Sequence, residues 1–205
     1  MSDARSLNWR FVVPDEPSGL LLLPMGEECT DSSVPARRDS AGVFVAHAGG
    51  TFPAVAAADL AAWTRRGGRR ESARLLAELC STVTPGGWLC VGFANARYPG
   101  SPRWRRSLRL HAVRRVLRRS GMAAPEVYAC LPDHRRPGLL VPLHRGAELD
   151  FVLRKLFLTY TSTDSSWPRL RRRVLGLMHH GALAAPHRAR AALVPGFCLV
   201  SRRPT

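Results

Sequence analysis

Residues Glu71 to Asn95 read ESARLLAELCSTVTPGGWLCVGFAN, and this stretch decides the fold. Its first half repeats apolar residues at three- and four-residue spacing, which predicts an amphipathic helix with one buried side. Pro85-Gly86-Gly87 then predicts a turn, because proline lacks the amide hydrogen that a helix needs and glycine tolerates a positive φ. Trp88 to Phe93 is almost wholly apolar, which is typical of a strand covered on both faces in a mainly parallel sheet. The stretch therefore predicts a helix, a turn and a buried strand in direct succession.

A helix followed by Thr84-Pro-Gly-Gly-Trp88, an apolar strand and Asn95 resembles the region around the fifth strand of the class I S-adenosylmethionine-dependent methyltransferases. Two later runs, Glu126 to Leu131 and Phe197 to Arg202, resemble the antiparallel pair that closes the sheet of that family. The resemblance covers residues 42 to 203. It implies an α/β fold with a Rossmann-like, methyltransferase-type sheet, mostly parallel with an antiparallel last strand, and it implies S-adenosylmethionine as the cofactor.

The N-terminal part of the sequence is short for such a fold. Leu20 to Leu23 is predicted to be the first central strand and Gly42 to Ala48 the fourth, followed by a helix from Pro53 to Trp63. Residues 24 to 41, which are 18 in number, separate the two strands. Two helices and two strands of ordinary length need about 50 residues. We therefore expect a sheet reduced in strand number, without the second strand whose acidic end holds the cofactor ribose in the resembled family.

Candidate cofactor residues follow the predicted strands. In the resembled family a glycine-rich loop comes after the first strand, and here that segment offers Gly26 with Glu27 beside it. His47 and Gly49 come at the end of the predicted fourth strand, and ligands of open α/β sheets bind at the carboxyl ends of strands. We expect Gly26, Glu27, His47 and Gly49 to contact the cofactor if one binds.

Candidate substrate and catalytic residues lie at later strand ends. Asn95, Arg97 and Tyr98 follow the fifth strand and are expected to contact a small-molecule substrate. His47 and His134 are the candidate catalytic bases, since an imidazole titrates near neutral pH. An aspartate precedes His134, but adjacent side chains seldom point at the same atom, so a plain turn is the alternative interpretation.

The rest of the chain predicts one basic helix and an insertion. Ser107 to Ser120 is predicted to be a helix with an apolar side and an arginine-rich side, capped by Gly121. Its arginines are expected to be solvated, because neither interleaved aromatic residues nor an RNA-binding motif accompanies them. Residues 133 to 195 are expected to form a helical insertion before the last strand that covers the substrate, within a single domain of residues 1–205.

Composition limits the classes of partner and location. The net charge is +16, and Lys155 is the only lysine among 31 lysine and arginine residues. Such a charge favours acidic partners, including nucleotides, phosphorylated substrates, a carrier protein or RNA. The five cysteines show no CxxC spacing, so we expect buried reduced thiols and no metal site. No apolar run is long enough to cross a membrane and no secretory pattern opens the chain, so we expect a cytoplasmic protein without a membrane span.

Three functions remain open from the sequence. The first is a methyltransferase-like enzyme that acts on a small molecule in specialised metabolism. The second is a degenerate relative without the cofactor, acting as a cofactor-independent enzyme of cyclisation or rearrangement or as a partner subunit. The third is an arginine-rich RNA-binding protein, although nucleic acid is the least favoured partner. A shortened sheet would also expose an edge beside its first strand, which predicts self-association or a partner there.

Overall fold

The structure is a computed structural model, and it describes residues 20–23, 33–35, 37–38, 44–45, 50–63, 68–98, 108–131, 133–135, 137–155, 181 and 191–205. Its strands are β1 Leu20–Leu23, β2 Ser33–Pro35, β3 Arg37–Arg38, β4 Phe44–Val45, β5 Phe52–Ala57, β6 Val83–Ala94, β7 Glu126–Leu131, β8 Leu139–Pro142 and β9 Gly196–Arg202. Its α-helices are α1 Arg69–Thr82, α2 Leu110–Arg119 and α3 Gly146–Lys155, and its short 3-10 helices are η3 Leu60–Trp63 and η4 Ala191–Leu193.

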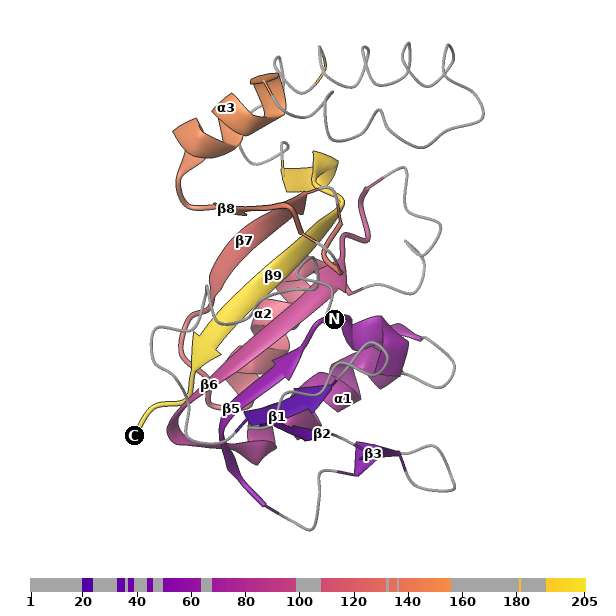
Figure 1. Cartoon of the computed structure of the whole chain (residues 1–205), viewed down its shortest axis with the longest axis vertical. Helices are drawn as coiled ribbons and strands as arrows, with labels where there is room; N and C mark the ends of the chain where they lie inside the picture. Colours follow the sequence, from indigo (N-terminus) through magenta and orange to yellow (C-terminus); the bar gives the residue numbers. More distant parts are fainter. Residues whose placement is uncertain are drawn as a thin grey trace.

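The main sheet has the strand order β2-β1-β5-β6-β9-β7-β8 (Figure 1). The first four strands of this order run parallel to their neighbours. The last strand of the chain, β9, enters antiparallel between β6 and β7, and β8 pairs antiparallel with β7 at the edge. This arrangement confirms the predicted Rossmann-like, methyltransferase-type sheet, mostly parallel before an antiparallel last strand.

Helix α1 and strand β6 confirm the stretch from which the sequence analysis started. The helix buries Leu75, Leu76, Leu79 and Cys80, as its spacing predicts. The predicted turn between the helix and the strand was wrong, because Pro85-Gly86-Gly87 lies inside β6, which already pairs with β5 at Val83. Gly86 has a φ of +75°, which glycine adopts without strain.

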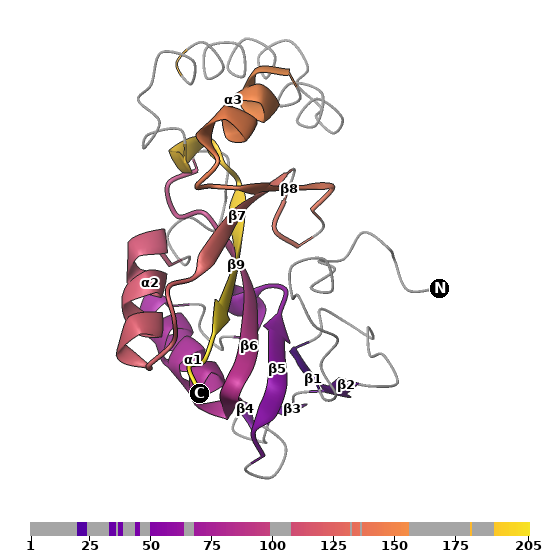
Figure 2. The same ribbon diagram turned by 90° about the vertical axis from the view of Figure 1, so that its left-hand side faces the viewer.

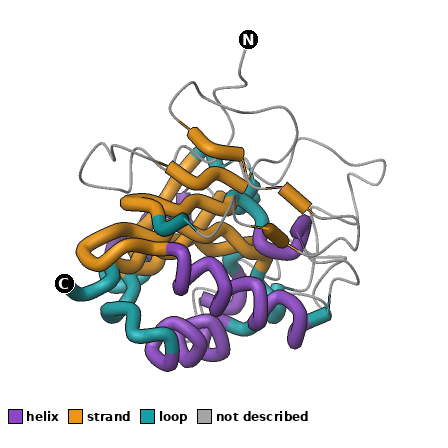
Figure 3. Tube along the Cα trace, turned by 90° about the horizontal axis from the view of Figure 1, so that it is seen from below, coloured by secondary structure: helices purple, strands orange, loops and turns teal. Residues whose placement is uncertain are grey.

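The two faces of the sheet have different cores. Helices α1 and α2 lie side by side on one face, where large aliphatic and aromatic side chains are buried (Figure 2). Seen from below, these helices and the strands form separate layers (Figure 3). The other face buries small side chains and thiols, namely Ala54, Ala56, Cys90, Cys130, Cys198 and Val200. Small side chains let other backbone segments approach this second face closely.

The described cysteines are buried free thiols, as predicted. Cys80, Cys90, Cys130 and Cys198 carry no disulfide, and Cys29 lies outside the described residues. The sulfur atoms of Cys90 and Cys198 are 3.6 Å apart across β6 and β9. Burial raises the pKa of the Cys80 thiol to about 11, so it stays protonated at neutral pH.

The predicted fourth strand was wrong. Of Gly42 to Ala48, Phe44–Val45 forms β4, which pairs with β3 in a separate two-stranded sheet. The strand that lies between β1 and β6 is β5, Phe52–Ala57, where the alanine-rich sequence predicted a helix from Pro53 to Trp63. Pro53 is accommodated because the register of β5 against β6 shifts between Phe52 and Ala54, and a strand tolerates proline at such an irregularity.

The predicted absence of a second strand was also wrong. Strand β2 pairs in parallel with β1 on the side away from β5, so the edge of β1 is covered. Strand β2 is short, with three residues. The seventh strand of the sheet is β8, which lies at the opposite edge.

The later elements agree with the sequence. Helix α2 ends at Arg119, two residues before Gly121, which has a φ of +74°, and it buries Val113 and Leu117. Helix α3 begins the predicted insertion beyond β8, while residues 156–180 and 182–190 of that insertion lie outside the described residues (Figure 1). Among the helices that the structure describes, none combines the length and apolar character needed to cross a bilayer.

Gly92 in β6 provides a test of close packing on the second face. A Cβ at this position would overlap the backbone carbonyl of Ala58, so Gly92→Ala is expected to lower the free energy of unfolding by about 1–3 kcal/mol. Urea denaturation measures this change. Gly68→Ala is the control, because nothing lies within 4 Å of its added Cβ. Equal stability of the two variants would contradict the packing.

Candidate functional site

Residues that follow β5, β6 and β7 lie at the carboxyl edge of the sheet. Asp59 comes two residues after β5, Asn95 comes directly after β6, and His134 follows β7. The strands are central and parallel to one another, which explains why residues so distant in sequence converge. Ligands of open α/β sheets bind at this edge, so these residues define the candidate site.

Asp59 is the centre of a buried charge cluster. Its carboxylate is 1% exposed. The Arg135 guanidinium lies 2.7 Å through Nε and 2.6 Å through Nη2 from Asp59 Oδ2. Asp59 Oδ1 accepts a hydrogen bond of 3.0 Å from the backbone N–H of Ala61, which fixes the carboxylate at the start of η3. Burial alone would raise the pKa of Asp59, but His134 and Arg135 lower it below its ordinary value.

His134 lies between two carboxylates. Its Nδ1 is 2.7 Å from Asp133 Oδ1, and its Nε2 is 3.4 Å from Asp59 Oδ1. Neither contact has the alignment of a hydrogen bond, so the attraction is mainly between charges. Burial lowers the pKa of His134, but the two carboxylates outweigh it and raise the pKa to about 9. The ring is therefore a cation at neutral pH, and its predicted role as a catalytic base stays a prediction that requires deprotonation first.

Gly196, at the start of β9, leaves room for His134 to lie against the sheet. A Cβ on Gly196 would lie 2.6 Å from the Cβ of His134 and 2.9 Å from its Nδ1. The backbone of β9 thus forms one wall around the imidazole. Together with the Asp59 contacts, this packing ties the segment after β7 to the end of β5 across the two strands between them.

Asn95 was predicted to contact the substrate, but its side chain forms hydrogen bonds within the protein. Its side chain is buried, and Nδ2 donates to the carbonyls of Ala191 at 2.9 Å and Val194 at 2.7 Å. Its Oδ1 accepts a hydrogen bond of 3.0 Å from the backbone N–H of Arg97. Both ends of the amide are satisfied, so Asn95 positions η4 above the end of β6.

A basic cavity of about 400 Å³ opens beside Asn95. We call it the β6 pocket; its lining residues are Asn95, Arg97, Arg109, Leu110, His111, Arg114, Ala191, Ala192 and Phe197. Arg97, which the sequence predicts as a substrate residue, lines it. Tyr98 belongs to the same turn through a backbone hydrogen bond to Asn95 O but does not line the cavity. The cluster of cations suits an anionic ligand.

Sequence reasoning missed Asp59 and the part of α2 that lines the β6 pocket. A carboxylate directly after a buried apolar run is a signal for Asp59, but the expected helix over that run concealed it. The arginines of α2 were expected to be solvated. Gly26, Glu27, His47 and Gly49 lie outside the described residues, so their predicted contacts with a cofactor stay predictions.

No metal site is formed within the described part of the chain. There, no group of three or more histidine, cysteine, aspartate or glutamate side chains is arranged to hold an ion. The cations of Arg135 and His134 neutralise the carboxylates of the buried cluster instead.

Comparison with known proteins gives weak similarities. No protein-family model matches the chain, and no curated protein sequence matches it significantly. Among solved structures, the (4+2)-cyclase SpnF is 18% identical with a TM-score of 0.39, over 85% of this chain and 57% of that one. The phosphoethanolamine N-methyltransferase 2 of Haemonchus contortus, in complex with phosphomonomethylethanolamine and S-adenosylhomocysteine, is 12% identical with a TM-score of 0.36, over 75% of this chain and 34% of that one.

The chain thus spans less than two thirds of either protein, and similarity at this level assigns neither substrate nor cofactor. The fold follows from the strand order itself. With β9 antiparallel between β6 and β7, the chain has a methyltransferase-type sheet.

The raised pKa of His134 predicts a pH-dependent stability. A group with a higher pKa in the folded state stabilises the protein fully below its ordinary pKa of 6.5, and that contribution is lost as the pH rises through about 9. We expect the free energy of unfolding to fall by up to about 3 kcal/mol across this window. Urea denaturation at a series of pH values measures it.

The matched variants are His134→Gln and His111→Gln. The first removes the titrating ring of the cluster and is expected to flatten the pH dependence in this window. The second changes an exposed histidine of α2 and is expected to leave the dependence intact. An unchanged slope in His134→Gln would show that another group is responsible.

Proposed function

We propose that the protein binds an anionic small molecule in the β6 pocket and acts on it without S-adenosylmethionine. This makes it a degenerate relative of the methyltransferases, as a cofactor-independent enzyme or as the binding subunit of a larger assembly. The observation that carries the proposal is the buried cluster at the end of β5, where Asp59 is already paired with Arg135 and His134. A carboxylate in that state has no free oxygen to offer a ligand.

The end of β2 supports the same proposal. In the resembled family an acidic residue at the end of the second strand grips the ribose of the cofactor. Here β2 ends at Pro35, and the next described residues are Arg37 and Arg38 of β3. An arginine offers no acceptor to a ribose hydroxyl, because the guanidinium carries donors only.

The β6 pocket supports an anionic substrate. Arg97 and Arg109 enter it from the segment after β6 and from the residue preceding α2. Guanidinium groups bind carboxylates and phosphates through two parallel hydrogen bonds. They also stabilise negative charge that develops on a substrate oxygen, which is what a cofactor-independent cyclisation or rearrangement requires.

Methyl transfer from S-adenosylmethionine is the second candidate. The parallel β2-β1-β5 side of the sheet favours it, since this side carries the cofactor in the resembled family. In that case Gly26 and Glu27 would contact the donor. The reaction would need mainly proximity and alignment of the methyl group with the acceptor, together with a base such as His47 for a hydroxyl substrate.

Calorimetric titration with S-adenosylmethionine and S-adenosylhomocysteine separates the two candidates. We expect no saturable binding of either compound at millimolar concentration. Micromolar binding that Gly26→Val abolishes would overturn the proposal and assign the protein to the methyl transferases by activity.

Binding of an anion in the β6 pocket has its own test. We expect phenyl phosphate to perturb the NMR signals of the β6 pocket and phenol to leave them unchanged. Arg109→Ala is expected to weaken binding of phenyl phosphate by about tenfold or more, because it removes a bidentate partner. Arg74→Ala, which changes an exposed arginine paired with Glu78 on α1, is the control. Equal binding of phenol, or no effect of Arg109→Ala, would contradict an anion site.

A further inference from the structure

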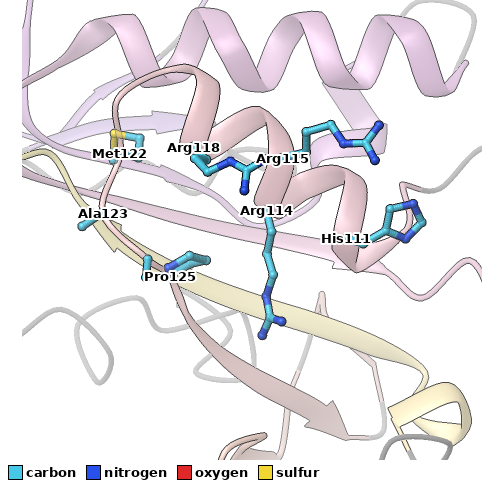
Figure 4. Close-up of a pocket in the computed structure, with 8 residues that line it drawn as sticks. His111, Arg114, Arg115, Arg118, Met122, Ala123 and Pro125 are labelled. Atoms are coloured by element: carbon cyan, nitrogen blue, oxygen red, sulfur yellow. The ribbon is translucent and has the colours of Figure 1, made fainter.

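Helix α2 carries a stripe of basic side chains along one side. His111, Arg114, Arg115 and Arg118 follow the three-, four- and seven-residue spacing that places side chains on one helical side, and all four are exposed. With residues 122–125 they line a cavity of about 600 Å³, which we call the α2 groove. Figure 4 shows the arginines projecting from the helix, with Met122, Ala123 and Pro125 in the segment that follows it.

The described part of the chain places no carboxylate against this stripe. Helix α2, LHAVRRVLRR, contains no acidic residue. Within the described residues, no carboxylate lies at ion-pair distance from Arg114, Arg115 or Arg118. The other helices differ, since Arg74 pairs with Glu78 on α1 and Arg145 pairs with Glu148 next to α3, each at 2.9 Å. The charge of α2 is thus available to a partner.

The α2 groove and the β6 pocket are neighbouring cavities that share lining residues. His111 and Arg114 line both cavities. A ligand held in the β6 pocket therefore lies directly beside any molecule bound along α2.

The groove fits an acidic helix better than a nucleic acid. Among its described lining residues none is phenylalanine, tyrosine or tryptophan, whereas stacking of bases on such side chains is the usual way in which single-stranded nucleic acids are bound. A second helix with acidic residues at the same three- and four-residue spacing would match the arginines along the 10 residues of α2, a length of about 15 Å. Met122, which is buried at the base of the groove, and Pro125 supply an apolar wall for its leucines.

We propose that the α2 groove docks an acidic amphipathic helix of a partner protein, which brings the anionic substrate to the β6 pocket. The delivery of substrate rests on the proposed function, but the docking itself does not. The net charge of +16 would speed the encounter with such a partner.

The test uses the full chain and a synthetic lactam-stapled peptide. The peptide carries glutamates along one side at three- and four-residue spacing and leucines along the adjacent side. Two control peptides carry glutamine or lysine in place of glutamate. Fluorescence anisotropy measures the affinity, and we expect binding of the glutamate peptide that weakens as salt is added, with no binding of the glutamine peptide.

Charge reversal distinguishes a specific groove from general attraction. The variant Arg115→Glu/Arg118→Glu changes residues that line the α2 groove and not the β6 pocket. We expect it to bind the glutamate peptide at least about tenfold more weakly and to gain binding of the lysine peptide. Arg70→Glu/Arg119→Glu alters the net charge equally at exposed positions outside the groove and is expected to change the affinity less than about threefold.

Several outcomes would overturn the docking proposal. These are absence of binding by the glutamate peptide, equal weakening by both double variants, or tighter binding of a single-stranded RNA oligonucleotide than of the peptide. Circular dichroism and thermal unfolding establish that each variant is folded. We expect Arg115→Glu/Arg118→Glu to bind phenyl phosphate with unchanged affinity, because neither residue lines the β6 pocket. Failure of docking and failure of the proposed function are therefore distinguishable.

Discussion

The buried carboxylate of Asp59 is the constraint on which the carboxyl edge of the sheet depends. Removing an ion from water costs several kcal/mol even after the protein relaxes, so a carboxylate that is 1% exposed must be compensated. Arg135 and His134 supply two positive charges, and Asp133 supplies a second negative one. The four charges sum to zero. Loss of any one of them would leave a buried charge without its partner, which explains how a short segment after β7 is fixed to the end of β5.

The second face of the sheet has the shape that this cluster requires. Gly92 in β6 has no side chain where Ala58 approaches, and Gly196 in β9 has none where His134 approaches. A side chain at either position would push the turn after β5 or the imidazole away from the strands. The small residues around them bury little apolar area, so most of the hydrophobic stabilisation comes from the α1 and α2 face. One face thus provides stability while the other permits the close contacts of the site.

The sequence predicted the elements whose periodicity is strong and local. Helix α1 and the strand after it follow from the leucine spacing and from the Pro-Gly-Gly segment, and the order of β7 and β9 follows from the resemblance. The strand β5 was mistaken for a helix, because a short alanine-rich run has neither a clear period of two nor one of 3.6. Its identity comes from pairing with β1 and β6, which are distant in sequence. The error displaced the candidate site from Asp59 to His47. The pairing of Asp59 with Arg135 is a tertiary contact, which no local pattern shows.

The arginines of α2 show why charge is harder to interpret than hydrophobicity. Where a charge is buried, desolvation forces the chain to supply a counter-charge, as it does for Asp59. Where it is exposed, water and salt screen it, and the folded state imposes no such requirement. An unpaired surface arginine is therefore compatible with a solvated face and with a binding site. What favours a site here is position, since two residues of the α2 stripe, His111 and Arg114, also line the β6 pocket. That coincidence arises from the fold, which brings the start of α2 to the same cavity as Asn95 and Phe197, and the sequence of the helix alone does not contain it.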